Sequence, residues 1–314
     1  IRTVPDYAYW RVETQYGAQY HGRLVVNASG PWASALMREN GFDETEIPDL
    51  RLVKGSHIIV PKIYDGGQCY ILQNDDNRIV FAIPYEGDFT LIGTTDVDMG
   101  HDPDEPPVIM EGEAAYLIDV INDYFVTDLS VSDIISAYSA VRPLIEEAGK
   151  SAAAVTRDYR LHMAYKDNLP VLNVLGGKIT TYRQLSDEAM PMIERALGLR
   201  GTKSWTATKP LPSGDIPNAD FDGFLAEMHK EFADEPRALV TRYARAYGTI
   251  APSLLAGDKG REIAPHVFET ELDHMIRREW AVSGEDALWR RSKLGLHLDA
   301  EEQRRINIWM ETHS

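Results

Sequence analysis

The stretch NVLGGKITTYRQLSDEAM, residues 173–190, changes from an apolar strand to a helix at a glycine corner. Gly176 and Gly177 permit either a positive φ or a very close approach of another group to the backbone. The helix that follows begins with free N–H groups and a positive dipole end, which favour an anion, and Lys178 adds a full positive charge there. A strand-to-helix turn without a ligand would give the same local pattern, so a binding site and a purely structural turn remain alternatives at this point.

A second corner of the same kind lies in VNASGPWA, residues 26–33. A short apolar strand leads to Ser29 and Gly30, and Pro31 then opens a helix, since proline is favoured in the first helical turn. Two such corners in one chain strengthen the ligand-binding interpretation of each.

The rest of the chain separates into a β-rich region and a helical region. Between residues 51 and 96, short β-prone runs alternate with turns rich in Gly, Asn and Asp, which is typical of antiparallel hairpins. The periodicity predicts an amphipathic helix over 111–125 and two further strands over 133–145 and 157–165. Beyond Gly198, several segments of about 10–15 residues have helical periodicity, which predicts an all-α C-terminal domain.

The composition limits the classes of partner. With 314 residues, 44% of them hydrophobic, the chain can form one large core or two moderate ones. A net charge of −17 argues against a nucleic-acid partner, because phosphate backbones are bound by clustered Lys and Arg. The single cysteine, Cys69, fits a reducing compartment, and no apolar run approaches the roughly 18–20 residues of a spanning helix. Asp96, Asp98, His101 and Asp102 lie close together but lack the spacing of a calcium or zinc motif, so a solvated acidic loop is favoured and no metal is expected.

Polar side chains in LVKGSHIIVP, residues 52–61, fall on both faces of a predicted strand. Strict alternation places Lys54 and Ser56 on one face and His57 on the other. A lone histidine in a strand is more often a hydrogen-bonded core residue than a catalytic base. The local pattern therefore favours the structural interpretation of His57, and only its surroundings can change that.

Arg142 lies inside an apolar β-like segment, SAVRPLIEE. A guanidinium group cannot stay unpaired in such a place without a cost of several kcal/mol. The residue therefore needs either a carboxylate from this acidic chain or a bound anionic substrate, and both alternatives stay open.

Seven segments of the chain together resemble the FAD-dependent glycerol-3-phosphate dehydrogenases of the aerobic, quinone-linked kind. They agree in order and spacing over nearly the whole chain. The segments are VNASGPWA (26–33), KGSHIIVP (54–61), IPYEGDFTLIGTTD (83–96), YSAVRPL (138–144), RDYRL (157–161), GGKITTYR (176–183) and LWRRSKLGL (288–296).

The resemblance implies an α/β (α+β) fold of the D-amino-acid oxidase-like type. Residues 1–46 and 171–200 would form the remaining part of a Rossmann-type FAD-binding domain. Residues 47–170 would form an antiparallel substrate-binding domain above the flavin, and residues 201–314 an all-α C-terminal domain.

One part of the family pattern is not found in this sequence. The N-terminal G-x-G-x-x-G unit that holds the FAD pyrophosphate is absent, and the first residues, IRTVPDYAYW, have neither an initiator methionine nor the features of a signal peptide. We therefore expect the chain to be the C-terminal two-thirds of such an enzyme, inactive by itself.

The intact enzyme would oxidise sn-glycerol 3-phosphate to dihydroxyacetone phosphate by hydride transfer to FAD, and the electrons would pass to a quinone. By the same resemblance His57 is the candidate base, and Arg142 and Lys178 bind the substrate above the flavin. Thr95 and Asp96 border the substrate pocket. The residues expected to contact the cofactor are Ser29, Gly30, Gly176, Gly177, Lys178, Ile179 and Thr180.

Three other functions stay open at this point. An α-glycerophosphate oxidase would share these motifs and use O2 as acceptor. A flavin amino-acid oxidase shares the fold but gives less reason for a lysine beside an arginine, and a non-catalytic interaction module could use the same scaffold. The resemblance further implies a cytoplasmic protein with peripheral contact at the inner face of the cell membrane, and it is compatible with a homodimer.

Overall fold

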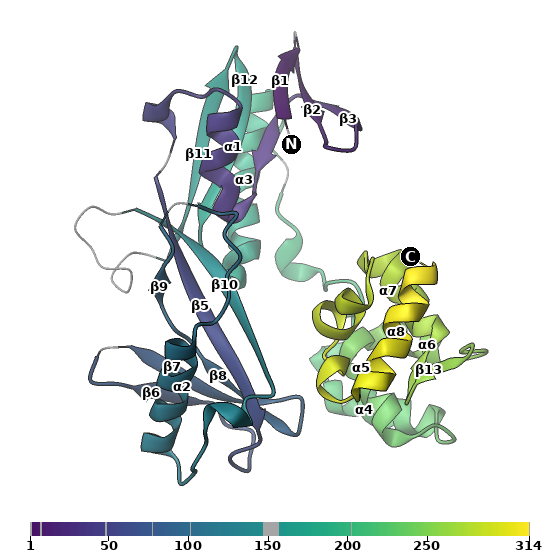
Figure 1. Cartoon of the computed structure of the whole chain (residues 1–314). Helices are drawn as coiled ribbons and strands as arrows, with labels where there is room; N and C mark the ends of the chain where they lie inside the picture. Colours follow the sequence, from purple (N-terminus) through teal and green to yellow (C-terminus); the bar gives the residue numbers. More distant parts are fainter. Residues whose placement is uncertain are drawn as a thin grey trace. The chain divides into compact units, whose positions relative to one another are not determined.

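The computed structural model describes residues 2–6, 8–47, 49–76, 78–100, 102–146, 157–201 and 203–313. The chain forms two compact units, Ile1–Ala207 and Thr208–Ser314 (Figure 1). The first unit contains three β-sheets, and the second is mainly helical.

A six-stranded antiparallel sheet is the largest sheet of the first unit (Figure 1). Its strands follow the order β10-β5-β8-β7-β6, and β9 also pairs with β5. Helix α2, Glu111–Tyr124, covers one face, where Ile58 and Ile92 of the sheet pack with Leu117 of the helix. The predicted hairpins and amphipathic helix are therefore confirmed. The strands are β5 Leu50–Pro61, β6 Tyr70–Gln73, β7 Ile79–Tyr85, β8 Phe89–Gly93, β9 Val97–Asp98 and β10 Ser136–Ile145.

A three-stranded sheet carries both glycine corners. Its order is β11-β12-β4, and β12 runs parallel to β4 and antiparallel to β11. Each of the two parallel strands is followed by a helix, which is the strand–corner–helix arrangement predicted from the sequence. The elements are β4 Val25–Asn27, η1 Gly30–Trp32, α1 Ala33–Glu39, β11 Tyr159–Lys166, β12 Leu169–Gly176, η4 Ile179–Thr181 and α3 Tyr182–Leu197.

A small N-terminal sheet packs against this α/β part. Its strands, in the order β1-β2-β3, are β1 Arg2–Asp6, β2 Tyr9–Glu13 and β3 Gln19–Gly22. Trp10 of β2 is fully buried with Met37 of α1 and Val171 of β12, and its indole Nε1 donates a hydrogen bond to the carbonyl oxygen of Pro170. Short 3₁₀ turns lie in the first unit at η2 Glu44–Glu46 and η3 Val131–Asp133, and η5 Thr206–Thr208 spans the boundary between the two units.

The second unit is helical, as predicted, with one short hairpin that its sequence periodicity did not indicate. Buried apolar side chains from α4, α5, α7 and α8 form a single core that includes Leu239, Leu272 and Ile306. The hairpin is β13 Glu262–Ala264 with β14 Val267–Phe268. The other elements are η6 Pro217–Ala219, α4 Phe221–Glu231, α5 Arg237–Tyr247, η7 Gly248–Ile250, α6 Ala251–Leu255, α7 Glu269–Glu279, the π-helical turn η8 Asp286–Arg291, η9 Leu294–Leu296 and α8 Ala300–His313.

In the part of the chain that the structure describes, no helix has both the length and the apolar character needed to cross a bilayer.

A buried carboxylate joins two helices of the second unit. Glu271 of α7 has no exposed surface, and both of its oxygens accept hydrogen bonds from Arg242 of α5, at 2.5 and 2.8 Å. The hydroxyl groups of Tyr243 and Tyr247 donate to the same carboxylate. Because these partners of Glu271 all come from α5, the cluster has a structural role and holds α5 and α7 together.

We expect Glu271→Gln to lower the free energy of unfolding of the second unit by about 3 kcal/mol, since removing one partner of a buried pair leaves the other uncompensated. Chemical denaturation followed by circular dichroism measures this loss. The matched control is Asp273→Asn, two residues further along α7, where the exposed ion pair with Arg277 should contribute less than about 1 kcal/mol. Equal losses in the two variants would contradict this account of the α5–α7 contact.

Candidate active site

The two glycine corners lie side by side at one edge of the α/β sheet. Strands β4 and β12 are parallel, with Asn27 opposite Asn173, so their carboxyl ends meet at the same edge. The side-chain nitrogen of Asn27 donates to the side-chain oxygen of Asn173 at 2.8 Å, and Ser29 Oγ donates to Asn27 Oδ1 at 2.6 Å. The corner at Ser29 and Gly30 is thereby tied to the strand that ends at Gly176.

The corner between β12 and η4 requires glycine for steric reasons inside the chain. Gly176 and Gly177 have φ values of 66° and 94°, which L side chains rarely adopt. A Cβ atom on Gly177 would lie 2.9 Å from the Cβ of Tyr159. At Gly30 the φ is also positive, but a Cβ there would meet no atom within 4 Å, so that corner is open on its outer side.

The residues that follow Gly177 face outward. Lys178, Ile179 and Thr180 are exposed, and Ile179 has 86% of its surface accessible. Thr181 occupies the N-cap position of α3, but its hydroxyl group donates to the carbonyl oxygen of Lys178 and caps no N–H group. The helix start therefore presents backbone N–H groups without a side-chain cap, as an anion site needs.

Strand β5 separates its polar side chains onto two faces, as the alternation predicted. Lys54 and Ser56 point toward α2, where both contact Glu113. His57 points to the opposite face, which this helix does not cover. The catalytic candidate is therefore on the face opposite α2, here termed the open face.

His57 lies between two neighbouring strands. Its ring stacks on that of Tyr138 from β10, with centroids 5.0 Å apart and an interplanar angle of 7°. On the other side it leans across Gly93 of β8, where any Cβ would clash with the imidazole. Its Nδ1 is buried without a hydrogen-bond partner among the described residues, which leaves Nε2 as the nitrogen available to a ligand.

The pKa of His57 is lowered from 6.5 to about 4. Burial is the larger cause, because it disfavours the charged imidazolium, and the positive charge of Arg142 adds to it. The imidazole is consequently neutral near pH 7, which is the form that can accept a proton.

Arg142 meets a carboxylate from its own chain. Its Nη1 lies 2.8 Å from Asp96 Oδ1 and 3.4 Å from the carbonyl oxygen of Thr95, and its Nη2 donates to Thr94 Oγ1 at 2.9 Å. The guanidinium group passes over Gly55, where a Cβ would occupy the same space. The structure thus supplies the carboxylate alternative, while the side chain of Arg142 stays 27% exposed on the open face.

A second arginine, which sequence reasoning did not single out, shares the same carboxylate. Arg157 Nη2 lies 3.4 Å from Asp96 Oδ2, and its side chain is 40% exposed. Among the described residues, the two guanidinium groups and the one carboxylate leave one net positive charge at this place. The arrangement suits an incoming anion better than a single closed ion pair would.

Strand β10, which carries Arg142, approaches the glycine corner at Gly176. A Cβ on Gly176 would lie 3.4 Å from the carbonyl oxygen of Pro143, the residue after Arg142. Of the other candidate residues, Thr95 is only 1% exposed, and its hydroxyl group donates to Glu113 on the covered face. The structure therefore places Arg142, Asp96 and the corner together, and it turns the side chain of Thr95 away from them.

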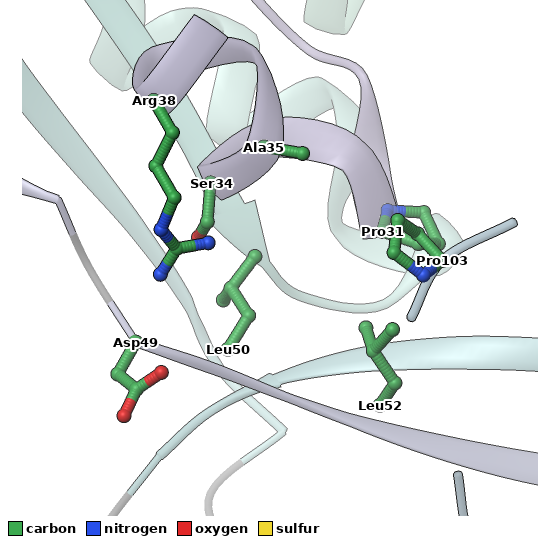
Figure 2. A pocket seen from close by; sticks show the side chains of 8 residues that line it. All are labelled: Pro31, Ser34, Ala35, Arg38, Asp49, Leu50, Leu52 and Pro103. Carbon is green, nitrogen blue, oxygen red and sulfur yellow. The ribbon is translucent and has the colours of Figure 1, made fainter. Parts of the chain in front are cut away.

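A hollow lies next to the Ser29–Gly30 corner, where α1 approaches β5 (Figure 2). Figure 2 shows Arg38 on α1 and, across from that helix, Asp49 with Leu50 and Leu52 of β5. None of the residues predicted for the site lines this hollow, and we assign it no function.

Two of the site residues that sequence reasoning missed could have been identified from the sequence. Tyr138 has the same parity as Arg142 on β10, so alternation places both on one face. Arg157 lies in RDYRL, a segment that supports the family resemblance. The roles of Gly55 and Gly93 could not be recognised from the sequence, because a glycine inside a strand can equally be a position that only weakens the strand.

Comparison with known proteins gives one family model, described as FAD dependent oxidoreductase, that matches residues 2–183. A glycerol-3-phosphate dehydrogenase of Pseudomonas aeruginosa is 39% identical over 96% of this chain and 60% of its own length. A D-erythritol 1-phosphate dehydrogenase of Brucella abortus is 38% identical over 96% and 62%. The solved structure of a glycerol-3-phosphate dehydrogenase from Bacillus halodurans, complexed with FAD, superposes with a TM-score of 0.78 at 23% identity and covers 99% of this chain and 67% of that one.

The chain belongs to the family of FAD-dependent oxidoreductases, since the family model matches more than half of it. The solved structure confirms the fold class predicted from the sequence. The chain spans about 60% of the length of these curated relatives.

The geometry of the two corners fits the cofactor of this family. Ser29 and Gly30 from one corner and Gly176, Gly177 and the exposed turn after them from the other present backbone groups at a single edge. The uncapped start of η4 and α3 adds N–H groups there. These are the groups with which Rossmann-type folds hold a dinucleotide.

We expect NMR titration of the imidazole resonances to give His57 a pKa of about 4, and Arg142→Met to raise it while leaving it below 6.5, because burial is the larger cause. Between pH 6.5 and about 4 the unfolded chain binds this proton more tightly than the folded one. The residue should therefore reduce stability progressively as the pH falls through that window.

The control for this titration is Arg51→Met on the same strand, whose side chain pairs with Asp98. This change should leave the pKa of His57 where it was. A wild-type His57 that titrates near 6.5 would refute both the burial and the charge effect.

Proposed function

We propose that this chain forms the substrate-binding part, and one side of the FAD site, of an enzyme that oxidises sn-glycerol 3-phosphate to dihydroxyacetone phosphate. The observation that carries the proposal is the pair Arg142 and Arg157 on one carboxylate, beside the glycine corner and on the same face as His57. The names of the relatives agree with this substrate.

The two arginines would bind the phosphate group. A phosphomonoester carries between one and two negative charges near pH 7, and guanidinium groups pair with its oxygens through two parallel hydrogen bonds. Asp96 would repel the phosphate if it touched it, so its role is to orient Arg142 and Arg157. Lys178, exposed beside the corner, would add a further positive charge on the side of the reacting carbon.

His57 would take the proton of the C2 hydroxyl group through Nε2. Its low pKa keeps the imidazole neutral over the whole physiological range, and stacking on Tyr138 holds the ring in one orientation. The charge of Arg142 disfavours imidazolium, so the ring would not retain that proton after turnover.

FAD would lie at the two corners, held by Ser29, Gly30, Gly176, Gly177 and the turn Lys178–Thr180, and it supplies the acceptor for the two electrons taken from the substrate. The chain's own part is to offer N–H groups and a positive helix end where negative charge collects.

The remaining length of the relatives would supply the G-x-G-x-x-G unit that this sequence lacks. We propose on that ground that the chain alone neither retains FAD nor turns over substrate. We further propose that the completed enzyme passes its electrons to a quinone, which requires contact with the inner face of the cell membrane; a homodimer is compatible with this. The alternative acceptor is O2, and the alternative to catalysis is an interaction module on the same scaffold.

A longer polyol phosphate is a second candidate substrate. The Brucella abortus relative, named for D-erythritol 1-phosphate, is as similar to this chain as the glycerol-3-phosphate dehydrogenases are. Both substrates present a hydroxyl group near a phosphomonoester, so the arginine pair fits either one.

The test joins this chain to the dinucleotide-binding segment of the Pseudomonas aeruginosa relative and follows flavin bleaching and dye reduction. We expect glycerol 3-phosphate to reduce the bound flavin and glycerol to leave it oxidised, because only the phosphate ester engages the arginines. Arg142→Ala should lower kcat/KM by at least about 100-fold with FAD still bound. Arg51→Ala is the matched control and should retain normal kinetics.

A flavin-loaded chimera that no polyol phosphate reduces would sink the proposal and favour the interaction module. Faster reduction by D-erythritol 1-phosphate would assign the second substrate. Oxygen consumption compared with reduction of a quinone analogue distinguishes the two acceptors. The chain without the added segment should purify colourless; a stoichiometric flavin spectrum would show that its own corners suffice.

A further inference from the structure

A buried polar cluster lies behind the sheet that carries the site. Glu113, near the start of α2, is 8% exposed, and around it Lys54, Ser56 and Thr95 are 5%, 0% and 1% exposed. Lys54 Nζ lies 2.7 Å from Glu113 Oε2. Ser56 Oγ and Thr95 Oγ1 donate to Glu113 Oε1 at 2.9 and 2.6 Å. Four polar side chains thus occupy a place where apolar residues would pack.

Such a cluster is poorly explained by stability alone. A buried ion pair seldom stabilises a fold more than apolar side chains of the same size would, because both charges lose their hydration. Burial raises the pKa of Glu113, but hydrogen bonds from Lys54, Thr95, the Met110 backbone and Ser56 outweigh it and keep the pKa below the usual value. The carboxylate is therefore ionised and fully engaged. A fixed geometry is what this arrangement provides.

The cluster connects directly to the arginine site through Thr95. The segment Thr94–Asp96 joins β8 to β9 without regular secondary structure of its own. Its middle hydroxyl group binds Glu113 and also accepts a hydrogen bond from the Ser56 N–H at 3.0 Å. Its two flanking side chains, Thr94 and Asp96, receive Arg142 on the opposite face. One short segment thus has Glu113 on one side and the guanidinium group on the other.

A second connection runs through the strand of Arg142 itself. Ser56 Oγ gives its proton to Glu113, so the 2.8 Å contact with Ser139 Oγ is a bond donated by Ser139. Ser139 lies on β10 beside Tyr138 and three residues before Arg142. The same carboxylate therefore braces both the strand that carries the arginine and the segment that receives it.

We propose that Glu113 is a positioning residue, which fixes the Thr94–Asp96 segment from the covered face of the sheet and so sets the orientation of Arg142 on the open face. Its relevance to glycerol 3-phosphate rests on the function proposed above. Without the bond from Thr95 to Glu113, the segment would sample several conformations, and Arg142 would pay an ordering cost whenever it bound an anion.

The test uses the 314-residue chain and substitutions behind the sheet. Thr95→Val removes the hydroxyl group that donates to Glu113 and accepts from the Ser56 N–H, and it leaves the Lys54–Glu113 pair intact. Thr95→Ser restores a hydroxyl group with both bonds. Arginine-selective ¹⁵N NMR reports the rotation of the Arg142 guanidinium group without any ligand. Calorimetry with glycerol 3-phosphate then reports its affinity.

We expect Arg142 to rotate slowly in the wild type and in Thr95→Ser, and freely in Thr95→Val. Affinity for glycerol 3-phosphate should fall at least about tenfold in Thr95→Val and less than about threefold in Thr95→Ser. Glu113→Met, whose side chain offers no oxygen to the Thr95 hydroxyl group, should act like Thr95→Val. The double variant should lose no more affinity than either single one, because both break the same connection.

Asn122→Ala separates positioning from general destabilisation. Asn122 lies near the C-terminal end of the same helix, and among the described residues its side chain bonds to Thr127 and Leu129, so this change lowers stability without touching the segment. It should leave the rotation of Arg142 unchanged.

Slow rotation of Arg142 in folded Thr95→Val would overturn the proposal, and so would additive losses in the double variant. If Glu113→Met fails to fold, Thr95→Val still decides. Should the wild type bind no glycerol 3-phosphate while Thr95→Val releases Arg142, the positioning role stands and the proposed substrate site falls.

Discussion

The site depends on two places in the central sheet where a side chain is missing. Arg142 lies over Gly55 and His57 leans across Gly93, and a Cβ atom at either glycine would occupy the space of its neighbour. Because strands β10, β5 and β8 are adjacent, these two glycines leave room for a guanidinium and an imidazole group on the same face of the sheet. Burial, with a smaller contribution from the charge of Arg142, keeps His57 neutral, and Asp96 holds Arg142 in place.

The remaining architecture brings backbone to this face. The parallel pairing of β4 and β12 joins two corners that are more than 140 residues apart, and the Asn27–Asn173 bond locks them together. The end of β10 then contacts Gly176, which links the two sheets at the site. A cofactor held by the corners and a substrate held by the arginines would therefore be neighbours, as the chemistry of the family requires.

Much of this fold could be predicted from the sequence, because it depends on local patterns of apolar, polar and glycine residues. Alternation in residues 52–61 correctly separates Lys54 and Ser56 from His57, and the two glycine corners and the helical C-terminal region follow from local pattern. Pairings between distant strands have no such local signature. The sequence could not show that Asp96 would face both Arg142 and Arg157, nor that the hydroxyl group of Thr95 would turn to Glu113. The hairpin β13–β14 was missed because its strands are only three and two residues long.

The central claim is that the two arginines and the corner form a site for a phosphomonoester. The most direct measurement is a titration of the chain with glycerol 3-phosphate, observed at the side-chain Nε–Hε resonances of Arg142 and Arg157, with glycerol as the uncharged control. The account predicts that both resonances shift together and saturate with glycerol 3-phosphate and stay in place with glycerol. Saturable shifts confined to arginines of the C-terminal unit, or equal shifts with glycerol, would contradict it.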